Sequence, residues 1–216
     1  CGGEDFYYPD GDKPDGAIPV DRIIRKIDAL FDKNDYAAAG RILEHWEKEA
    51  RLLKDRRGEL SVQSELMGYY RKTGEKEKGL KSVERGLELV KLLGGEDGVS
   101  SATVYLNAAT TLKAFGEAES LYKRALAVME KAEHGQADAA VTYVNMAHLY
   151  ETWQNDEEKI SACMEKAEEL LNTPSLPRNG YYAFVCSKCA PSFGYFGYFL
   201  VDEELQKRAK EIYERA

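Results

Sequence analysis

Apolar residues recur at three- and four-residue spacings along most of the chain, which predicts amphipathic helices. The first stripe follows Pro19, and Asp21 is its expected N-cap. Its members are Ile23, Ile24, Ile27, Leu30 and Phe31. Asn34-Asp35 predicts a turn, and a second stripe begins at Ala39. The local unit is therefore a helix, a short turn and a second helix.

The same unit recurs along the chain. Three glycine-containing dipeptides are expected to end later helices: Thr73-Gly74, Gly94-Gly95 and His134-Gly135. Residues 104–109 read VYLNAA and residues 142–147 read TYVNMA, so two first helices share Tyr, a branched residue, Asn and Ala. Equivalent places in the second helices follow one another after 40, 39 and 42 residues, at Trp46, Gly86, Ala125 and Ala167. Self-similarity at such a period is typical of a stacked helical array.

These units resemble the tetratricopeptide repeat (TPR). The best match has the family's order of large, aromatic, turn, small, bulky and small residues, at Leu66, Tyr69, Tyr70, Gly74, Gly79, Val83 and Gly86. Small residues let helices approach closely, and large neighbours fill the remaining space. The resemblance implies an all-α fold, a right-handed α-solenoid of stacked antiparallel helix pairs. A period of about 40 rather than ~34 is typical of long-helix variants and leaves HEAT-like pairing as an alternative.

The resemblance divides the chain into two parts. Residues 1–20 form an irregular acidic leader that holds three of the six prolines. Residues 21–216 form a TPR-like domain of about five helix pairs, whose last helix has the polar outer face of a capping helix. Near Gly116 the third pair aligns only if about three residues are missing or the turn is tight. In the fifth pair, the string CSKCAPSFGYFGYF is similar to the tail of uncharacterised TPR proteins from anaerobic Firmicutes.

Composition narrows the partners and the location. Among 216 residues, 30 Lys and Arg stand against 38 Asp and Glu, and the net charge of -8 makes nucleic acid an unexpected partner. No apolar run approaches the roughly 18 residues of a transmembrane segment. Four cysteines are too few for a disulfide framework, so we expect a cytoplasmic protein. A lipoprotein anchored through Cys1 is the minor alternative.

The chain carries no motif of a known catalytic site. A nucleophile elbow, a phosphate loop, a zinc-protease motif and a dinucleotide fingerprint are all missing from the sequence. We therefore expect no enzyme, no catalytic residue and no cofactor. Cys186 and Cys189 form a C-x-x-C motif, which suits a redox pair or half of a zinc site. Because only Cys163 and His148 are candidates for further ligands, we favour structural thiols on a buried face and expect no metal.

In the family, the first helix of each pair lines a concave groove in which ligands bind. Asn107 and Asn145 occupy the same place in two first helices, and a carboxamide can both donate to and accept from an extended peptide. The alternative is that each bridges neighbouring helices. Thr110 and His148 lie one turn further, whereas Glu65 stands where a chaperone-tail clamp would need Asn. Four basic residues are expected along the same groove and favour an acidic or C-terminal peptide: Arg71, Lys72, Lys113 and Lys188.

The sequence thus predicts a non-enzymatic scaffold that binds a protein or peptide in its concave groove. One alternative is a structural protein that self-associates, as a homodimer or a larger assembly, through an aromatic C-terminal surface. The aromatic residues of that surface are Phe193, Tyr195, Phe196, Tyr198 and Phe199. A further alternative is a thiol- or metal-dependent protein that uses Cys186 and Cys189.

Overall fold

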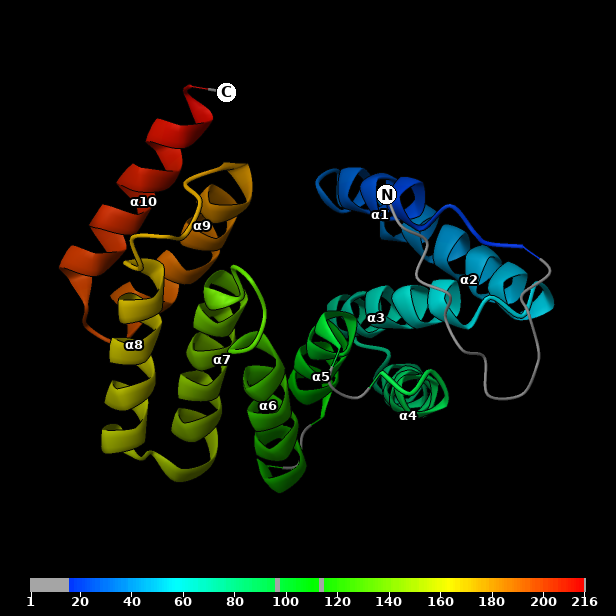
Figure 1. Cartoon of the computed structure of the whole chain (residues 1–216), viewed down its shortest axis with the longest axis horizontal. Coiled ribbons are helices and arrows are strands. Elements are labelled where there is room, and N and C mark those ends of the chain that lie inside the picture. Colours follow the sequence, from blue (N-terminus) through cyan, green and yellow to red (C-terminus); the bar gives the residue numbers. More distant parts are fainter. Residues whose placement is uncertain (1–15, 96–97, 113–114, 216) are drawn as a thin grey trace. The chain divides into compact units, whose positions relative to one another are not determined.

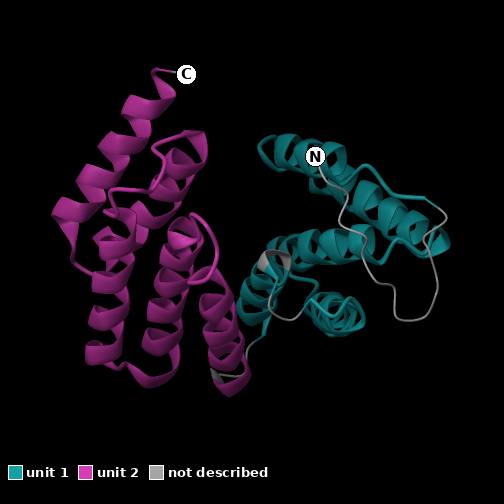
Figure 2. Cartoon of the chain, viewed as in Figure 1, with its two compact units in different colours: residues 1–112 teal, residues 113–216 magenta. Residues whose placement is uncertain are grey.

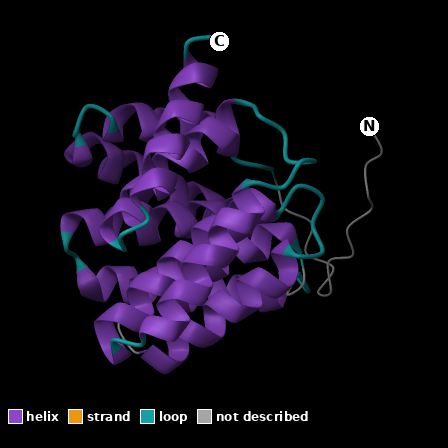
Figure 3. Cartoon of the chain, turned by 90° about the vertical axis from the view of Figure 1, so that its left-hand side faces the viewer, coloured by secondary structure: helices purple, strands orange, loops and turns teal. Residues whose placement is uncertain are grey.

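The computed structural model describes residues 16–95, 98–112 and 115–215. Within these ranges the chain forms ten helices and no strand (Figures 1 and 3). The fold class predicted from the sequence, an all-α solenoid of antiparallel helix pairs, is confirmed. The helices are α1 (Val20–Phe31), α2 (Tyr36–Leu52), α3 (Arg56–Thr73), α4 (Lys76–Leu92), α5 (Val99–Thr111), α6 (Phe115–Met129), α7 (Gln136–Gln154), α8 (Glu157–Leu171), α9 (Gly180–Tyr195) and α10 (Phe199–Tyr213).

The helices belong to two compact units, residues 1–112 (unit 1) and residues 113–216 (unit 2) (Figure 2). The boundary falls inside the third predicted helix pair, at the place where the repeats align poorly. There α5 ends because Leu112 is extended, with φ −68° and ψ 141°. Residues 113–114, which include the predicted groove residue Lys113, lie outside the described residues.

Within each unit the helices pack as stacked pairs. In unit 1, α3 contacts α1, α2, α4 and α5, and in unit 2, α7 contacts α6, α8 and α9. The first helices of successive pairs are also bonded directly, because α7 and α9 share hydrogen bonds between residues 43 or 44 positions apart. This spacing agrees with the period of about 40 that the sequence predicts.

The start of α1 differs from the prediction. Pro19, not Asp21, is the N-cap residue, and its carbonyl oxygen accepts the N–H groups of Arg22 and Ile23 at 3.0 Å. Asp21 lies in the first turn, where its negative charge interacts favourably with the positive end of the helix dipole and stabilises the helix. Ile18, two residues before α1, is buried, and its N–H donates to the Asp55 carboxylate at 2.9 Å.

The end of α6 also differs from the prediction, because the helix stops at Met129 and not at His134-Gly135. After Met129 the α-helical hydrogen bonding ends: the N–H of Ala132 donates to the Met129 carbonyl, three residues earlier, at 3.1 Å, as in a 3₁₀ turn. Gly135 instead stands at the N-cap of α7. The predicted end at Gly74 is confirmed, since this residue is left-handed with φ 76°.

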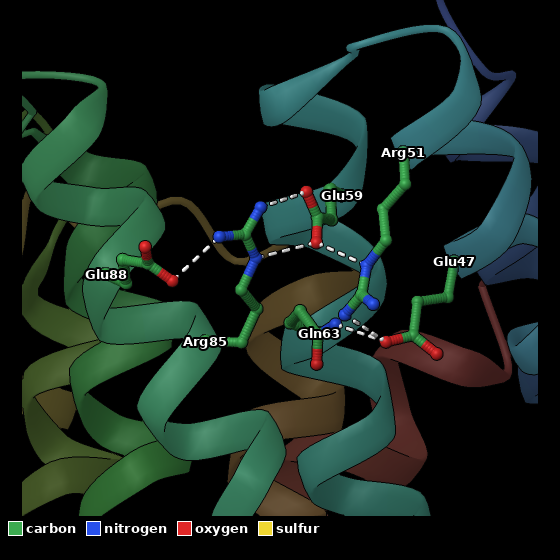
Figure 4. Close-up of polar contacts among 6 residues, drawn as sticks. All are labelled: Glu47, Arg51, Glu59, Gln63, Arg85 and Glu88. Carbon is green, nitrogen blue, oxygen red and sulfur yellow. Dashed lines mark hydrogen bonds and ion pairs between the residues drawn. The ribbon is translucent and has the colours of Figure 1, made fainter.

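A charged network joins α2, α3 and α4 in unit 1 (Figure 4). Glu59 of α3 is 2% exposed and accepts both Nε and Nη2 of Arg85 at 2.8 Å and Nε of Arg51 at 2.9 Å. Glu47 of α2 accepts from Arg51 at 2.8 Å and from Gln63 at 2.7 Å. Burial alone would raise the pKa of Glu59, but the two arginines outweigh it and lower the pKa below its ordinary value. The network therefore holds a buried carboxylate in its charged form.

Candidate functional site

The predicted groove residues are divided between the two units. Those in unit 1 are Arg71, Lys72, Asn107 and Thr110, and those in unit 2 are Asn145, His148 and Lys188.

Three of the predicted groove residues of unit 1, Asn107, Arg71 and Thr110, form hydrogen bonds within the unit. The Asn107 carboxamide of α5 donates to the Ser64 hydroxyl of α3 at 2.7 Å. The Arg71 guanidinium of α3 donates to the backbone carbonyl of Asn107 at 3.0 Å and to the Thr111 hydroxyl at 2.9 Å. Thr110 donates to the backbone of its own helix. In this unit, then, the asparagine bridges neighbouring helices, as the alternative interpretation of the sequence had it.

Asn145 of α7 is in a different position. It is half-buried, and within the described residues its carboxamide makes no hydrogen bond. One turn further, His148 Nε2 lies 3.0 Å from the Ser192 hydroxyl of α9. The His148 ring contacts Phe196 and Tyr195, with centroid separations of 4.8 and 5.6 Å. Asn145 therefore lies one helical turn from His148, and no described residue uses its side-chain donor or acceptor.

A row of exposed side chains runs along α9 beside these α7 residues. Tyr181, Phe184 and Tyr195 are 51%, 52% and 64% exposed, and Lys188 is exposed between them. The rings of Tyr181 and Phe184 stack at 6.3 Å, and Lys188 Nζ lies 5.9 Å from the Phe184 centroid. We call this surface the α7–α9 face. Its residues are Asn145, His148, Tyr181, Phe184, Lys188 and Tyr195.

The aromatic part of this row was not predicted as a groove surface. Tyr181, Phe184, Lys188 and Tyr195 are spaced by three, four and seven residues, so they share one side of an α-helix. The buried side of α9 is apolar as well, with Tyr182, Val185 and Phe193 among its residues. Because both sides are rich in aromatic residues, the pattern alone does not reveal which side is exposed.

Two tyrosine hydroxyl groups tie α9 to α7 at the ends of the α7–α9 face. Tyr181 donates to Asp138, and Tyr195 donates to Glu151. Burial and the hydrogen bond to Asp138 raise the pKa of Tyr181, while the hydrogen bond to Glu151 raises that of Tyr195. Both phenols stay protonated at neutral pH, and each donates one hydrogen bond to a carboxylate that remains charged. Between these two ends, Lys188 adds an exposed positive charge.

The two cysteines of the C-x-x-C motif lie on the buried side of α9. Burial raises the pKa of Cys186 and raises that of Cys189 to about 12. The thiolate is the form that attacks substrates and binds metals, so this environment suppresses both reactions. Among the described residues, no group of three or more His, Cys, Asp and Glu side chains is placed to hold a metal ion.

The aromatic C-terminal residues do not form one surface. Phe193 is fully buried, and Phe196 packs on His148 of the α7–α9 face. Phe199 and its neighbour Leu200, at the start of α10, are 66% and 82% exposed. The exposed part of this region is therefore divided between Tyr195 of the α7–α9 face and the beginning of α10.

Among the described residues, no helix has both the length and the apolar character needed to cross a membrane. No family model matches the chain, and no curated protein matches it. Solved structures do. The crystal structure of BtubC (BKLC) from P. vanneervenii is 22% identical, with a TM-score of 0.62, over 91% of this chain and 80% of that chain. A putative kinesin light chain from Podospora anserina, with nearly identical TPR-like repeats, is 14% identical, with a TM-score of 0.61, over 91% and 95%. The chain therefore has a TPR-like fold.

Proposed function

Given this TPR-like fold, we propose that the protein is a non-enzymatic scaffold that binds an extended peptide segment of a partner on the α7–α9 face. The observation that carries the proposal is the free carboxamide of Asn145 beside a row of exposed aromatic rings. An extended peptide has unpaired backbone N–H and C=O groups, and one carboxamide can satisfy one of each.

The remaining residues of the α7–α9 face suit such a ligand. Tyrosine and phenylalanine rings offer large contact areas with few rotatable bonds, so little conformational entropy is lost on binding. Lys188 places a positive charge beside the rings and favours a carboxylate on the peptide. The proposed ligand is therefore still an acidic peptide, as the sequence predicts, but it binds to unit 2. We do not assign Arg71 of unit 1 to the ligand, because its guanidinium donates to α5.

Peptide selection tests this proposal. Peptides selected from a random phage-displayed library on the full chain would be synthesised with a fluorophore, and their affinities measured by fluorescence anisotropy. Because one to two hydrogen bonds are lost, Asn145→Ala should weaken the binding of the selected peptide by about tenfold. Lys188→Gln should lower the affinity for peptides that carry a carboxylate and leave the affinity for neutral peptides unchanged.

The matched control is Asn107→Ala, which removes the equivalent side chain of unit 1. Because Asn107 donates to Ser64, this variant should lower the free energy of unfolding by about 1 kcal/mol while leaving the peptide affinity unchanged. Equal effects of both alanine variants on affinity, or no effect of Asn145→Ala, would show that the α7–α9 face is not the binding surface.

Self-association is the second candidate, supported by the exposed pair Phe199 and Leu200. Analytical ultracentrifugation of the wild type and of the double variant Phe199→Ser/Leu200→Ser tests it. If α10 mediates a homodimer, the wild type sediments as a concentration-dependent dimer and the variant as a monomer. A monomeric wild type at all concentrations removes this candidate.

A further inference from the structure

Unit 1 contains an open pocket of about 720 Å³. It lies between α1, α3 and α5 and the end of α4. Apolar side chains from three of these helices line it, among them Ile24, Leu60 and Val104. A volume in this range is that of a typical ligand site. We call it the unit 1 pocket.

Glu65 of α3 lines the unit 1 pocket beside this apolar wall. Within the described residues its carboxylate accepts no hydrogen bond, although Glu59 on the same helix accepts three. Burial raises the pKa of Glu65, and the negative charge of Asp28 on α1 raises it further. A carboxylate that is partly desolvated and next to a like charge gains free energy when a cation approaches.

Two arginines, Arg71 and Arg57, bring positive charge to this part of unit 1. Arg71 acts on Glu65 electrostatically and lowers its pKa, but its guanidinium donates to Asn107 and Thr111 of α5. Arg57 lines the pocket eight residues before Glu65, which is about 12 Å along the axis of α3. The Glu65 end therefore combines an apolar wall with a carboxylate whose charge Arg71 offsets only in part, and to which no described residue donates a hydrogen bond.

We infer that the unit 1 pocket receives a basic side chain, arginine or lysine, from a partner protein. The aliphatic stem would lie against Ile24, Leu60 and Val104, and the charged group would donate to Glu65. Charge complementarity favours a basic occupant, since an anionic or purely apolar group would desolvate the half-buried carboxylate further and give it no hydrogen-bond donor. This site is separate from the α7–α9 face, so each can fail without the other.

Two probes that differ only in charge test the inference. They are Nα-acetyl-L-arginine N-methylamide and its neutral counterpart Nα-acetyl-L-citrulline N-methylamide, titrated into the ¹⁵N-labelled full chain at low ionic strength. We expect saturable shifts of the backbone amides that border the unit 1 pocket, such as those of Glu65 and Val104. A charged hydrogen bond predicts that the arginine probe binds about tenfold more tightly than the citrulline probe.

Glu65→Gln should abolish the preference for arginine, because the neutral amide no longer attracts a cation. The control Glu77→Gln makes the same charge change at an exposed position of α4 outside the pocket and should keep the preference. Thermal melting checks that both variants fold; Glu65→Gln removes a desolvated charge and should melt no lower than the wild type. Equal binding of the two probes, shifts confined to the α7–α9 face, or no saturable shift would each overturn the inference.

Discussion

At the scale of single residues, Glu59 shows how one buried charge holds three helices. Its carboxylate lies on α3, and its partners Arg51 and Arg85 belong to α2 and α4 (Figure 4). Both arginines keep part of their surface in water, so the cost of their desolvation is small compared with that of Glu59. The network therefore favours the packed arrangement because it satisfies a carboxylate that the packing itself has buried.

Glu59→Gln should lower the free energy of unfolding by about 1–3 kcal/mol, because two arginines lose their charged acceptor. Chemical denaturation measures this value. The control Glu88→Gln removes the other partner of Arg85, whose side chain is largely exposed, and should cost less than about 1 kcal/mol. Similar losses for both variants would show that burial of Glu59 adds nothing to the network.

The contribution of Glu59 should also depend on pH. Its pKa is lower in the folded state than in the unfolded state, so the folded state binds this proton less readily. The stabilisation is fully present above the unfolded pKa and is lost as the pH falls through the lowered folded pKa. The stability difference between the wild type and Glu59→Gln should therefore shrink on acidification. A difference that stays constant down to acid unfolding contradicts this mechanism.

At the scale of helices, small residues mark the closest contacts. Ala39, Ala125 and Ala167 are fully buried, as the repeat pattern requires. Gly40 of α2 faces the hydroxyl end of the Tyr69 side chain of α3, where a Cβ atom would be 2.8 Å from Cζ. Gly68 of α3 has ordinary space, because the nearest atom to a Cβ there is an Arg71 nitrogen at 3.8 Å. The two glycines therefore have different roles, although both lie inside helices.

Replacement by alanine should separate these roles. Gly40→Ala should lower the free energy of unfolding by about 1–3 kcal/mol, because the Tyr69 ring must move out of a packed site. Gly68→Ala should raise it by about 0.5–1 kcal/mol, because alanine loses less backbone entropy on folding. Urea titration of the two variants gives both values. A stabilising Gly40→Ala would mean that α2 and α3 approach less closely than described.

At the scale of the whole molecule, the described helices form two units that each have their own core (Figure 2). In unit 1 a hydrophobic cluster joins α1, α2 and α3, and in unit 2 α7 and α9 pack between their neighbours. In such arrays each helix is stabilised by its immediate neighbours, so stability is a sum of local terms. A local defect is then expected to have a local effect.

Hydrogen exchange with mass spectrometry tests this locality. In Gly40→Ala, faster exchange should be confined to α1, α2 and α3, while α7–α10 should keep the protection of the wild type. The matched variant Gly68→Ala should show no faster exchange in either unit. Equal loss of protection in both units would indicate that the chain opens as one cooperative block.

The repeat, the helix pairs and the small buried residues follow from the sequence, because amphipathic periodicity indicates which side is covered in the helices that have one apolar and one polar side. The same pattern cannot state which neighbour's polar atom lies within hydrogen-bond distance. Asn107 and Asn145 are equivalent in the repeat, yet only Asn107 meets a hydroxyl group, that of Ser64. The aromatic row of α9 and the carboxylate of Glu65 in the unit 1 pocket depend in the same way on the packing of distant helices. Tertiary structure decided these features, since hydrogen-bond geometry and desolvation arise only when helices far apart in the chain meet.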